Sequence, residues 1–291
     1  MSAVLPPIRP EFERAPVSLD VGAVEASRPL PLARRLWQLA PLRQGLLLVL
    51  LALVWEAAAR WADNDLLLPT FVQTTQAFVK DFASGELLDK TLISLSLLLQ
   101  GYALGAAGAL ALTALAVSTQ LGRDLLATLT AMLNPLPAIA LLPLALLWFG
   151  LGKASLLFVL VHSVMWPLAL ATFSGFQSVP ETLRMAGRNY GLSGLRYVAQ
   201  ILVPSALPAI LSGLRIGWAF AWRTLIAAEL FFGASSGRGG LGWFIYQNRN
   251  ELYTDRVFAG LATVILIGLL VERLGFDTLE RVTVRRWGMQ R

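Results

Sequence analysis

The sequence contains no cysteine, a single histidine and few charged residues. Without cysteine, the chain has no disulfide, no thiolate metal ligand and no thiol nucleophile. One histidine among scattered carboxylates does not form a catalytic or metal-binding constellation, so we expect neither an enzyme nor a metal site. Only 14% of the residues are charged, against about 25% in soluble domains. With 56% hydrophobic residues, this deficit of charge indicates a membrane protein.

The sequence also lacks a convincing nucleotide site, although two stretches look like one. Residues 237–242, GRGGLG, satisfy the G-x-G-x-x-G pattern of dinucleotide-binding sites, but they follow an apolar stretch rather than the strand that such a site requires. We therefore expect a tight turn or re-entrant loop there, on the outer side of the membrane. Residues 152–155, GKAS, lack the upstream glycine of a P-loop, and Ala154 stands where it needs serine or threonine. We therefore expect no cofactor on this chain. If the activity of this chain is driven by ATP, a separate subunit binds ATP and Mg.

Six apolar stretches are long enough, at about 20 residues, to cross a bilayer as helices. They are residues 44–61, 92–118, 126–149, 154–176, 206–232 and 257–275. We therefore expect an all-α, polytopic membrane protein. The third stretch contains Pro135, Pro137 and Pro143, which free backbone carbonyls, so we expect it in the protein interior rather than against lipid.

Two further features concern the neighbourhood of the second span. Residues 70–79 should form a helix on the outer surface.

Gly101 and Gly105 form a G-x-x-x-G pair that permits close helix contact. Packing within one chain is the favoured interpretation of this pair, and packing between subunits is the alternative.

Lysine and arginine predict the orientation. With the N-terminus inside, the cytoplasmic segments carry most of these residues, which places both termini in the cytoplasm. We expect a cytoplasmic tail at 1–41, a transmembrane domain at 42–275 and a basic cytoplasmic tail at 276–291. The net charge of +6 then reflects topology and lipid headgroups rather than nucleic-acid binding.

A polar, basic segment at 178–208 separates two apolar blocks and has the signals of two short helices. Ser178 and Glu181 have the spacing of a capping box, with Pro180 in the first turn. Gly191 can take the left-handed conformation that ends a helix, and Ser193 can cap the next one. From this pattern alone, an interfacial helical hairpin without a partner remains an alternative.

The segment resembles the "EAA" loop in the permease subunits of bacterial ABC importers. The family pattern is E-A-A, three residues, Gly, nine residues and I-x-L-P. Here Ala186, Gly191, Ile201 and Pro204 match, whereas Met185, Gly187 and Val203 depart. In that family the loop is the coupling helix that docks on the cytoplasmic ATPase. The resemblance implies a set of coupling residues, which are Glu181, Arg184, Met185, Ala186, Gly187, Arg188 and Gly191. Methionine in place of glutamate favours an apolar docking contact.

The resemblance extends from about Leu42 to the C-terminus. It includes WFGLGK at 148–153, SGLR at 212–215, AAE at 227–229 and GGLG at 239–242, and it is closest to the nitrate, sulfonate and taurine branch. It implies a type I importer permease in the bacterial inner membrane. It further implies two copies of this chain, two ATPase subunits and an extracytoplasmic binding protein. The expected substrate is a small anion such as an aliphatic sulfonate, taurine or nitrate.

Ionisable residues within spans usually face a cavity or a partner because they are costly in the bilayer. The fifth span contains Arg215, Arg223 and Glu229, and the fourth contains His162. The candidate pathway residues are His162, Trp222, Arg223 and Glu229. Arg223 either lines the pathway for an anion or pairs with a structural partner. His162 is favoured as a helix-packing histidine that makes a hydrogen bond, and a role in the pathway is the alternative.

Two other function classes are weighed against the importer. An ion- or proton-coupled secondary transporter would need an acidic or histidine relay, for which Glu229 and His162 are the candidates, and no inverted repeat is evident. A membrane-embedded enzyme or scaffold lacks a catalytic cluster.

Overall fold

The computed structural model describes residues 39–232 and 239–286. The chain divides into two units, Met1–Leu53 and Val54–Arg291. Within the described ranges every regular element is a helix, which confirms the all-α prediction.

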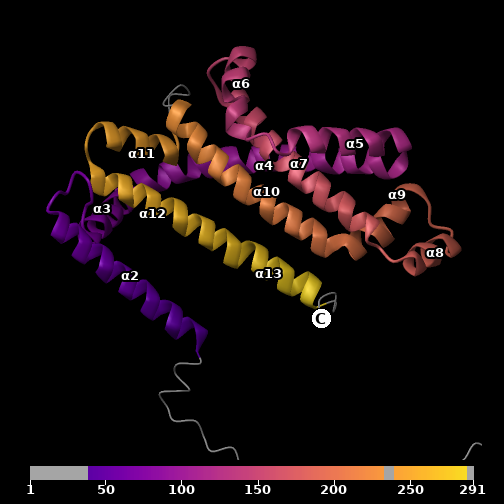
Figure 1. The fold of residues 1–291 in the computed structure, drawn as a ribbon, viewed down its shortest axis with the longest axis horizontal. Coiled ribbons are helices and arrows are strands. Elements are labelled where there is room, and N and C mark those ends of the chain that lie inside the picture. Colours follow the sequence, from indigo (N-terminus) through magenta and orange to yellow (C-terminus); the bar gives the residue numbers. More distant parts are fainter. Residues whose placement is uncertain (1–38, 233–238, 287–291) are drawn as a thin grey trace, which may run out of the picture. The chain divides into compact units, whose positions relative to one another are not determined.

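The helices follow one another with short connections (Figure 1). In chain order they are α2 (Ala40–Ala62), α3 (Phe71–Ala83), α4 (Glu86–Ser118), α5 (Gln120–Leu133), the 3₁₀ turn η1 (Ala138–Leu141), α6 (Leu142–Phe149), α7 (Lys153–Gln177), α8 (Glu181–Asn189), α9 (Gly194–Tyr197), the π-helical turn η2 (Val198–Leu202), α10 (Val203–Phe232), α11 (Leu241–Asn250), α12 (Thr254–Leu270), η3 (Val271–Phe276), α13 (Asp277–Glu280) and η4 (Arg281–Arg285).

Five of these helices are long and apolar enough to cross a membrane, which agrees with five of the six expected spans. They contain α2, α4, α7, α10 and α12. The last one continues through η3, α13 and η4 as far as Arg285, beyond the expected end at residue 275.

The third expected span is not one straight helix. The pair formed by Gln120–Leu133 and Ala138–Phe149 is bent by 90°. The break contains Pro135 and Pro137, which have no N–H to continue the helical ladder. In this single chain Leu126 and Ala145 of the span are buried and Leu147 is 80% exposed, so the expectation that the span lies against protein rather than lipid stays a prediction.

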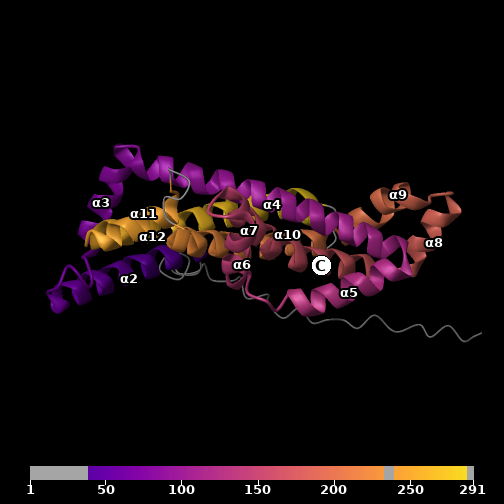
Figure 2. The ribbon, with the colours of Figure 1, turned by 90° about the horizontal axis from the view of Figure 1, so that it is seen from above.

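The centre of the second unit is the packing of α4 and α10 against α7, and the three helices run side by side in both views (Figures 1 and 2). A Cβ on Gly101 would lie 2.5 Å from the Cβ of Leu160, and one on Gly105 would lie 2.7 Å from the Cβ of Val164. Small residues therefore let α4 approach α7 closely, as small residues do in membrane proteins. The expected role of Gly101 and Gly105 in packing within one chain is confirmed.

Helices α3 and α11 lie at one end of this bundle, and α8 and α9 lie at the other (Figures 1 and 2). Helix α3 confirms the helix expected at 70–79. It begins with a capping box, in which the Thr70 side chain accepts from the Gln73 N–H and the Gln73 side chain accepts from the Thr70 N–H. Arg256, at the start of α12, bonds Asp81 of α3 at 2.8 Å and Glu86 of α4 at 2.6 Å. These bonds fix α3 against the end of the bundle.

Candidate functional site

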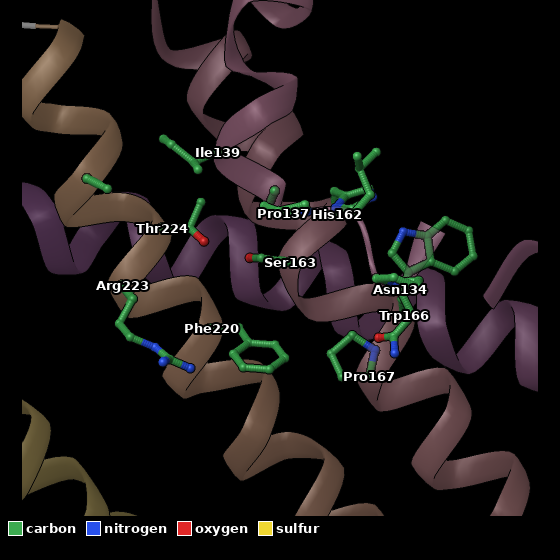
Figure 3. Close-up of a pocket in the computed structure, with 14 residues that line it drawn as sticks. Asn134, Pro137, Ile139, His162, Ser163, Trp166, Pro167, Phe220, Arg223 and Thr224 are labelled. Carbon is green, nitrogen blue, oxygen red and sulfur yellow. The ribbon is translucent and has the colours of Figure 1, made fainter. Parts of the chain in front are cut away.

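The candidate site is a partly open cavity of about 450 Å³ beside the middle of α7 and α10 (Figure 3). Three walls form it, which are the 90° break between α5 and α6, the middle of α7, and the middle of α10. The break contributes Asn134, η1 contributes Ile139, and α7 contributes Trp166. The same prolines that interrupt the third span therefore open a space beside α7 and α10.

Arg223 is the one lining residue with a formal charge in the described part of the chain. It is exposed, its Nε donates to the carbonyl oxygen of Ala219 at 3.1 Å, and its guanidinium carbon lies 5.1 Å from the ring centroid of Phe220. No carboxylate of the described residues lies within ion-pair distance of it. The structure thus places Arg223 in the cavity and gives it no acidic partner there.

Arg215, the other arginine of α10, has the opposite environment. Its guanidinium lies 3.1 Å from Glu272, 2.9 Å from Asp277 and 3.3 Å from Glu280. These carboxylates belong to the helix that continues α12, so Arg215 ties the end of that helix to α10. Of the two arginines of α10, Arg215 is therefore surrounded by carboxylates, whereas Arg223 has none within ion-pair distance among the described residues.

His162 also lines the cavity, but its ring nitrogens do not face the open space. Both are buried and have no hydrogen-bond partner among the described residues. The ring lies 6.0 Å from that of Trp166 in an edge-on arrangement. The burial agrees with the expected packing role, but the hydrogen bond expected for His162 is not formed among the described residues.

The other two expected pathway residues lie outside the cavity. Trp222 is 6% exposed, and its Nε1 donates to the carbonyl oxygen of Val264 at 3.3 Å, which joins α10 to α12. Glu229 is 5% exposed and lies among α4, α10 and α11. The structure therefore brings Arg223 and His162 together in the cavity and places Trp222 and Glu229 in helix contacts.

Glu229 caps α11 across the bundle. One carboxylate oxygen accepts the Gly242 N–H at 2.7 Å, and Ser94 Oγ lies 2.8 Å from both carboxylate oxygens. Ser94 in turn accepts the Leu241 N–H at 2.7 Å. A carboxylate is favourable at a helix N-terminus because the first backbone N–H groups have no partner within the helix. The described part of the expected glycine turn, Gly239 and Gly240, leads into this cap, whereas residues 237 and 238 lie outside the described residues.

The segment at 178–208, which we expect in the cytoplasm, contains the two predicted helices, α8 and α9. The capping box predicted for Ser178 and Glu181 is wrong. Ser178 ends α7, and its hydroxyl donates to the Gly175 carbonyl oxygen. Pro180 occupies the N-cap of α8, with no side-chain cap. Gly191 has φ of +73° and follows the C-cap, so the predicted left-handed end of the helix is confirmed.

The expected coupling residues of α8 fall into two groups. Gly187 is buried, and a Cβ there would lie 2.9 Å from Ile201 Cγ1, so its small size serves contact within the chain. Arg184 donates to the carbonyl oxygens of Phe176 at 2.7 Å and Val179 at 3.1 Å, where α7 ends. Its guanidinium is therefore used within the chain.

The remaining coupling residues are more open. Exposed side chains on and next to α8 are Glu181, Met185, Arg188 and Tyr190, and Ala186 is half-buried. Tyr190, the last residue of the helix expected to dock, is 85% exposed.

Sequence reasoning also missed most of the cavity wall. Asn134, Ile139, Ser163, Trp166, Phe220 and Thr224 line it. The prolines of the third span indicated a disturbance there, but no local pattern shows which residues of α7 and α10 face it.

Comparison with known proteins agrees with this architecture. A family described as "Binding-protein-dependent transport system inner membrane component" matches residues 107–276. The taurine transport system permease protein TauC of Escherichia coli is 32% identical over 81% of this chain and 86% of its own length. The putative aliphatic sulfonates transport permease protein SsuC of the same organism is 31% identical, covering 80% and 87%. The nitrate import permease protein NrtB of Synechocystis is 30% identical, covering 80% and 86%.

A solved structure supports the fold independently. The crystal structure of an amino acid ABC transporter with histidines has a TM-score of 0.51 at 18% identity, and the match covers 74% of this chain and 96% of that one. The bent third span, the helical bundle and the family match lead to one conclusion. This chain is a member of the binding-protein-dependent transport system inner membrane component family, the permease subunits of ABC importers.

Proposed function

We propose that this permease subunit imports a small anion and that Arg223 supplies the positive potential that admits it. The observation that carries the proposal is a guanidinium without a carboxylate partner among the described residues, set in an open cavity between spanning helices. A charge at such a position is costly unless it faces a cavity or a ligand. Relatives named for taurine, aliphatic sulfonates and nitrate support a substrate of this class.

We further propose that α8 couples the pathway to separate ATPase subunits, which bind ATP and Mg. Its exposed Met185, Arg188 and Tyr190 are available to such a partner. An extracytoplasmic binding protein would deliver the substrate at the other end of the bundle, near α3 and α11. This arrangement requires both termini on the cytoplasmic side of the bacterial inner membrane, in keeping with the distribution of lysine and arginine.

A second copy of the chain would complete the pathway, with lipid around the pair. The cavity is partly open, and α6 carries exposed apolar residues such as Leu147 and Trp148. A pathway lined by one chain alone would leave Arg223 facing lipid on the open side. In a homodimer the two cavities can face each other, so the free-energy cost of exposing the Arg223 guanidinium to lipid is avoided.

An ion- or proton-coupled carrier is the competing function. It requires a relay at Glu229 or His162. Glu229 is held by Ser94 and Gly242, and the His162 nitrogens do not face the cavity. Neither group is placed to pass protons along the pathway, so the importer is the better supported function.

The test is uptake by the assembled complex. The chain is co-expressed with its cognate ATPase and binding protein and reconstituted in liposomes, and accumulation of labelled taurine, nitrate and ethanesulfonate is measured with and without ATP. We expect ATP-dependent uptake of at least one anion, loss of uptake in Arg223→Ala, and partial retention in Arg223→Lys. Lys153→Ala, which changes a cation outside the cavity, is the control. Uptake that needs no ATP and stops with a protonophore would instead support the carrier.

A further inference from the structure

Arg215 of α10 has more carboxylates around it than one guanidinium needs. Its Nε lies 3.1 Å from Glu272, and one of its terminal nitrogens lies 2.9 Å from Asp277 and 3.3 Å from Glu280. The three carboxylates follow one another along the helix that continues α12. At about 1.5 Å per residue, the first and the last are about 12 Å apart along its axis. An arginine that moved along this helix by one turn, about 5.4 Å, would still have a carboxylate within reach.

The π-helical turn η3 brings these carboxylates to one face. The Asp277 N–H donates to the Glu272 carbonyl oxygen, a bond across five residues that defines a π-helical turn. In an α-helix, side chains five residues apart point about 140° away from each other. The π-helical turn removes this divergence, and Glu280 follows Asp277 one turn later on the same side. The irregular backbone therefore presents all three carboxylates to α10, in keeping with the frequent use of π-helical turns at functional sites.

A second polar contact between α10 and α12 also allows a shift of one turn. Trp222 Nε1 donates to the Val264 carbonyl oxygen at 3.3 Å. Gly268 lies one turn further along α12, and a Cβ there would be 3.9 Å from the same Nε1. Because Gly268 has no side chain, Trp222 can reach its carbonyl oxygen after such a shift, and a carbonyl oxygen in a helix has a second lone pair with which to accept. Trp222 and Arg215 are two turns apart on one face of α10, so one movement changes both contacts.

The two helices are not closely packed beside the carboxylates. A cavity of about 270 Å³ separates them, with Ser212 of α10 on one side and Phe276 and Val284 on the other. The aromatic contact next to it joins Trp218 to Phe276, with 6.4 Å between the ring centroids. Such an apolar contact has no fixed direction. The space and the contact therefore leave the register of the two helices to the polar groups.

Helix α8 is connected to this region through the start of α10. A Cβ on Gly187 of α8 would lie 2.9 Å from Ile201 Cγ1 in η2, and η2 continues directly into α10. A displacement of α8 is therefore passed to α10 without an intervening loop.

We propose that α10 slides along α12 toward α8 by about one helical turn, or 5.4 Å, in each transport cycle. Arg215 then leaves Glu272 and keeps Asp277 and Glu280, while Trp222 exchanges its carbonyl partner for the next one along α12. The inference rests on the proposed function, in which α8 receives the movement of the ATPase. It makes the three carboxylates a set of successive partners that hold α10 to α12 while the two helices move.

The first test measures the distance between α10 and α12 with spin labels in the reconstituted complex. The chain has no cysteine, so Ile216→Cys and Leu261→Cys, both at exposed positions, can be labelled specifically. Labelled chain is diluted with unlabelled chain, so that distances within one copy are measured. On addition of ATP with EDTA, which prevents hydrolysis, we expect this distance to increase by about 5 Å, because α10 moves away from the start of α12. The pair Ile216→Cys and Phe231→Cys, both on α10, should show no change.

Gly268→Leu should stop the slide, because its side chain fills the place that Trp222 enters. We expect loss of the distance change and at least about tenfold slower uptake, with an unchanged midpoint of thermal unfolding. The matched control is Gly275→Leu in the same helix, where a Cβ would meet only Val271 of that helix, at 3.6 Å. The control should change neither the distance nor uptake.

Variants of the carboxylates separate a slide from a static tie. The double variant Asp277→Asn and Glu280→Gln removes the partners of the shifted state, so uptake should fall about two- to tenfold. Glu272→Gln removes the partner that Arg215 leaves behind and should not slow uptake. In a static tie, uptake would instead follow the thermal stability of each variant.

An unchanged or shortened distance between residues 216 and 261 on ATP binding would overturn the slide, even in a complex that transports. A distance increase that persists in Gly268→Leu would also overturn it. Neither result bears on the proposed function, which is judged by ATP-dependent uptake with the unmodified chain. Conversely, a complex that takes up no anion but shows the increase would contradict the proposed function and support the slide.

Discussion

Ser94 and Glu229 are 135 positions apart in the sequence, yet the serine hydroxyl lies 2.8 Å from both oxygens of the glutamate. The contact joins α4 to α10 and holds the N-terminus of α11 through the backbone N–H groups of Leu241 and Gly242. A buried carboxylate thus serves as a cap for a helix that belongs to another part of the chain. Its role is to position α11 at one end of the bundle.

Glu229→Ala should destabilise the protein. The change leaves the Gly242 N–H and the Ser94 hydroxyl without their acceptor in a buried site, so we expect a loss of about 3 kcal/mol in unfolding free energy. Thermal unfolding of the purified chain measures it. Glu251→Ala, which alters an exposed glutamate at the other end of α11, is the control. A Glu229→Ala protein as stable as that control would show that the cap contributes nothing.

Arg256→Ala should separate α3 from the bundle. Arg256 bonds Asp81, whose side chain is 6% exposed, and Glu86. Removing the cation leaves a buried carboxylate unpaired, which we expect to cost about 2 kcal/mol after allowance for the partial exposure of Arg256. Arg60→Ala, which removes a 71% exposed side chain that pairs with Glu56 one turn away in α2, should change little. Proteolysis near residue 84 and the midpoint of thermal unfolding report the difference, and identical behaviour of the two variants would contradict the prediction.

Met185→Asp should block docking of the ATPase without unfolding the chain. Met185 is 49% exposed on α8, and a charge there would be buried in an apolar contact. We expect loss of ATPase co-purification and of substrate-stimulated hydrolysis, with an unchanged midpoint of thermal unfolding. Gly187→Trp should instead lower the midpoint of thermal unfolding as well as ATPase co-purification, because any side chain at this position meets Tyr197 and Ile201.

The matched control for Met185→Asp is Tyr253→Asp. Tyr253 is 52% exposed and lies directly before α12, at the end of the bundle away from α8 (Figure 1). The variant Tyr253→Asp should leave ATPase binding intact. If Met185→Asp retains the ATPase and its stimulation, α8 is not the coupling element.

Cysteines introduced at residues 193 and 67 should react from opposite sides of the membrane. The chain has no cysteine, and Ser193 and Leu67 are both exposed. With both termini in the cytoplasm, Ser193→Cys should react with an impermeant maleimide only in inverted vesicles. Leu67→Cys should react only in right-side-out spheroplasts. Labelling of both from one side would refute the proposed orientation.

The sequence alone determined the features that depend on local chemistry. A bilayer requires long apolar helices, so five spans could be placed from composition and length. Gly191 could be assigned to a helix end because few other residues adopt a positive φ. The prolines at 135 and 137 marked an interruption, although the sequence did not show that the chain turns by 90° there.

Only the tertiary structure decided which polar groups are free and which are used. Arg215 and Arg223 look alike on one helix, but the first meets three carboxylates from a distant helix and the second faces a cavity. Glu229 looked like a pathway residue until Ser94 and Gly242 were placed beside it. A hydrogen bond or ion pair depends on atoms within about 3 to 4 Å. Residues that are far apart in the sequence reach that distance only when the helices pack, so no local pattern could have assigned these partners.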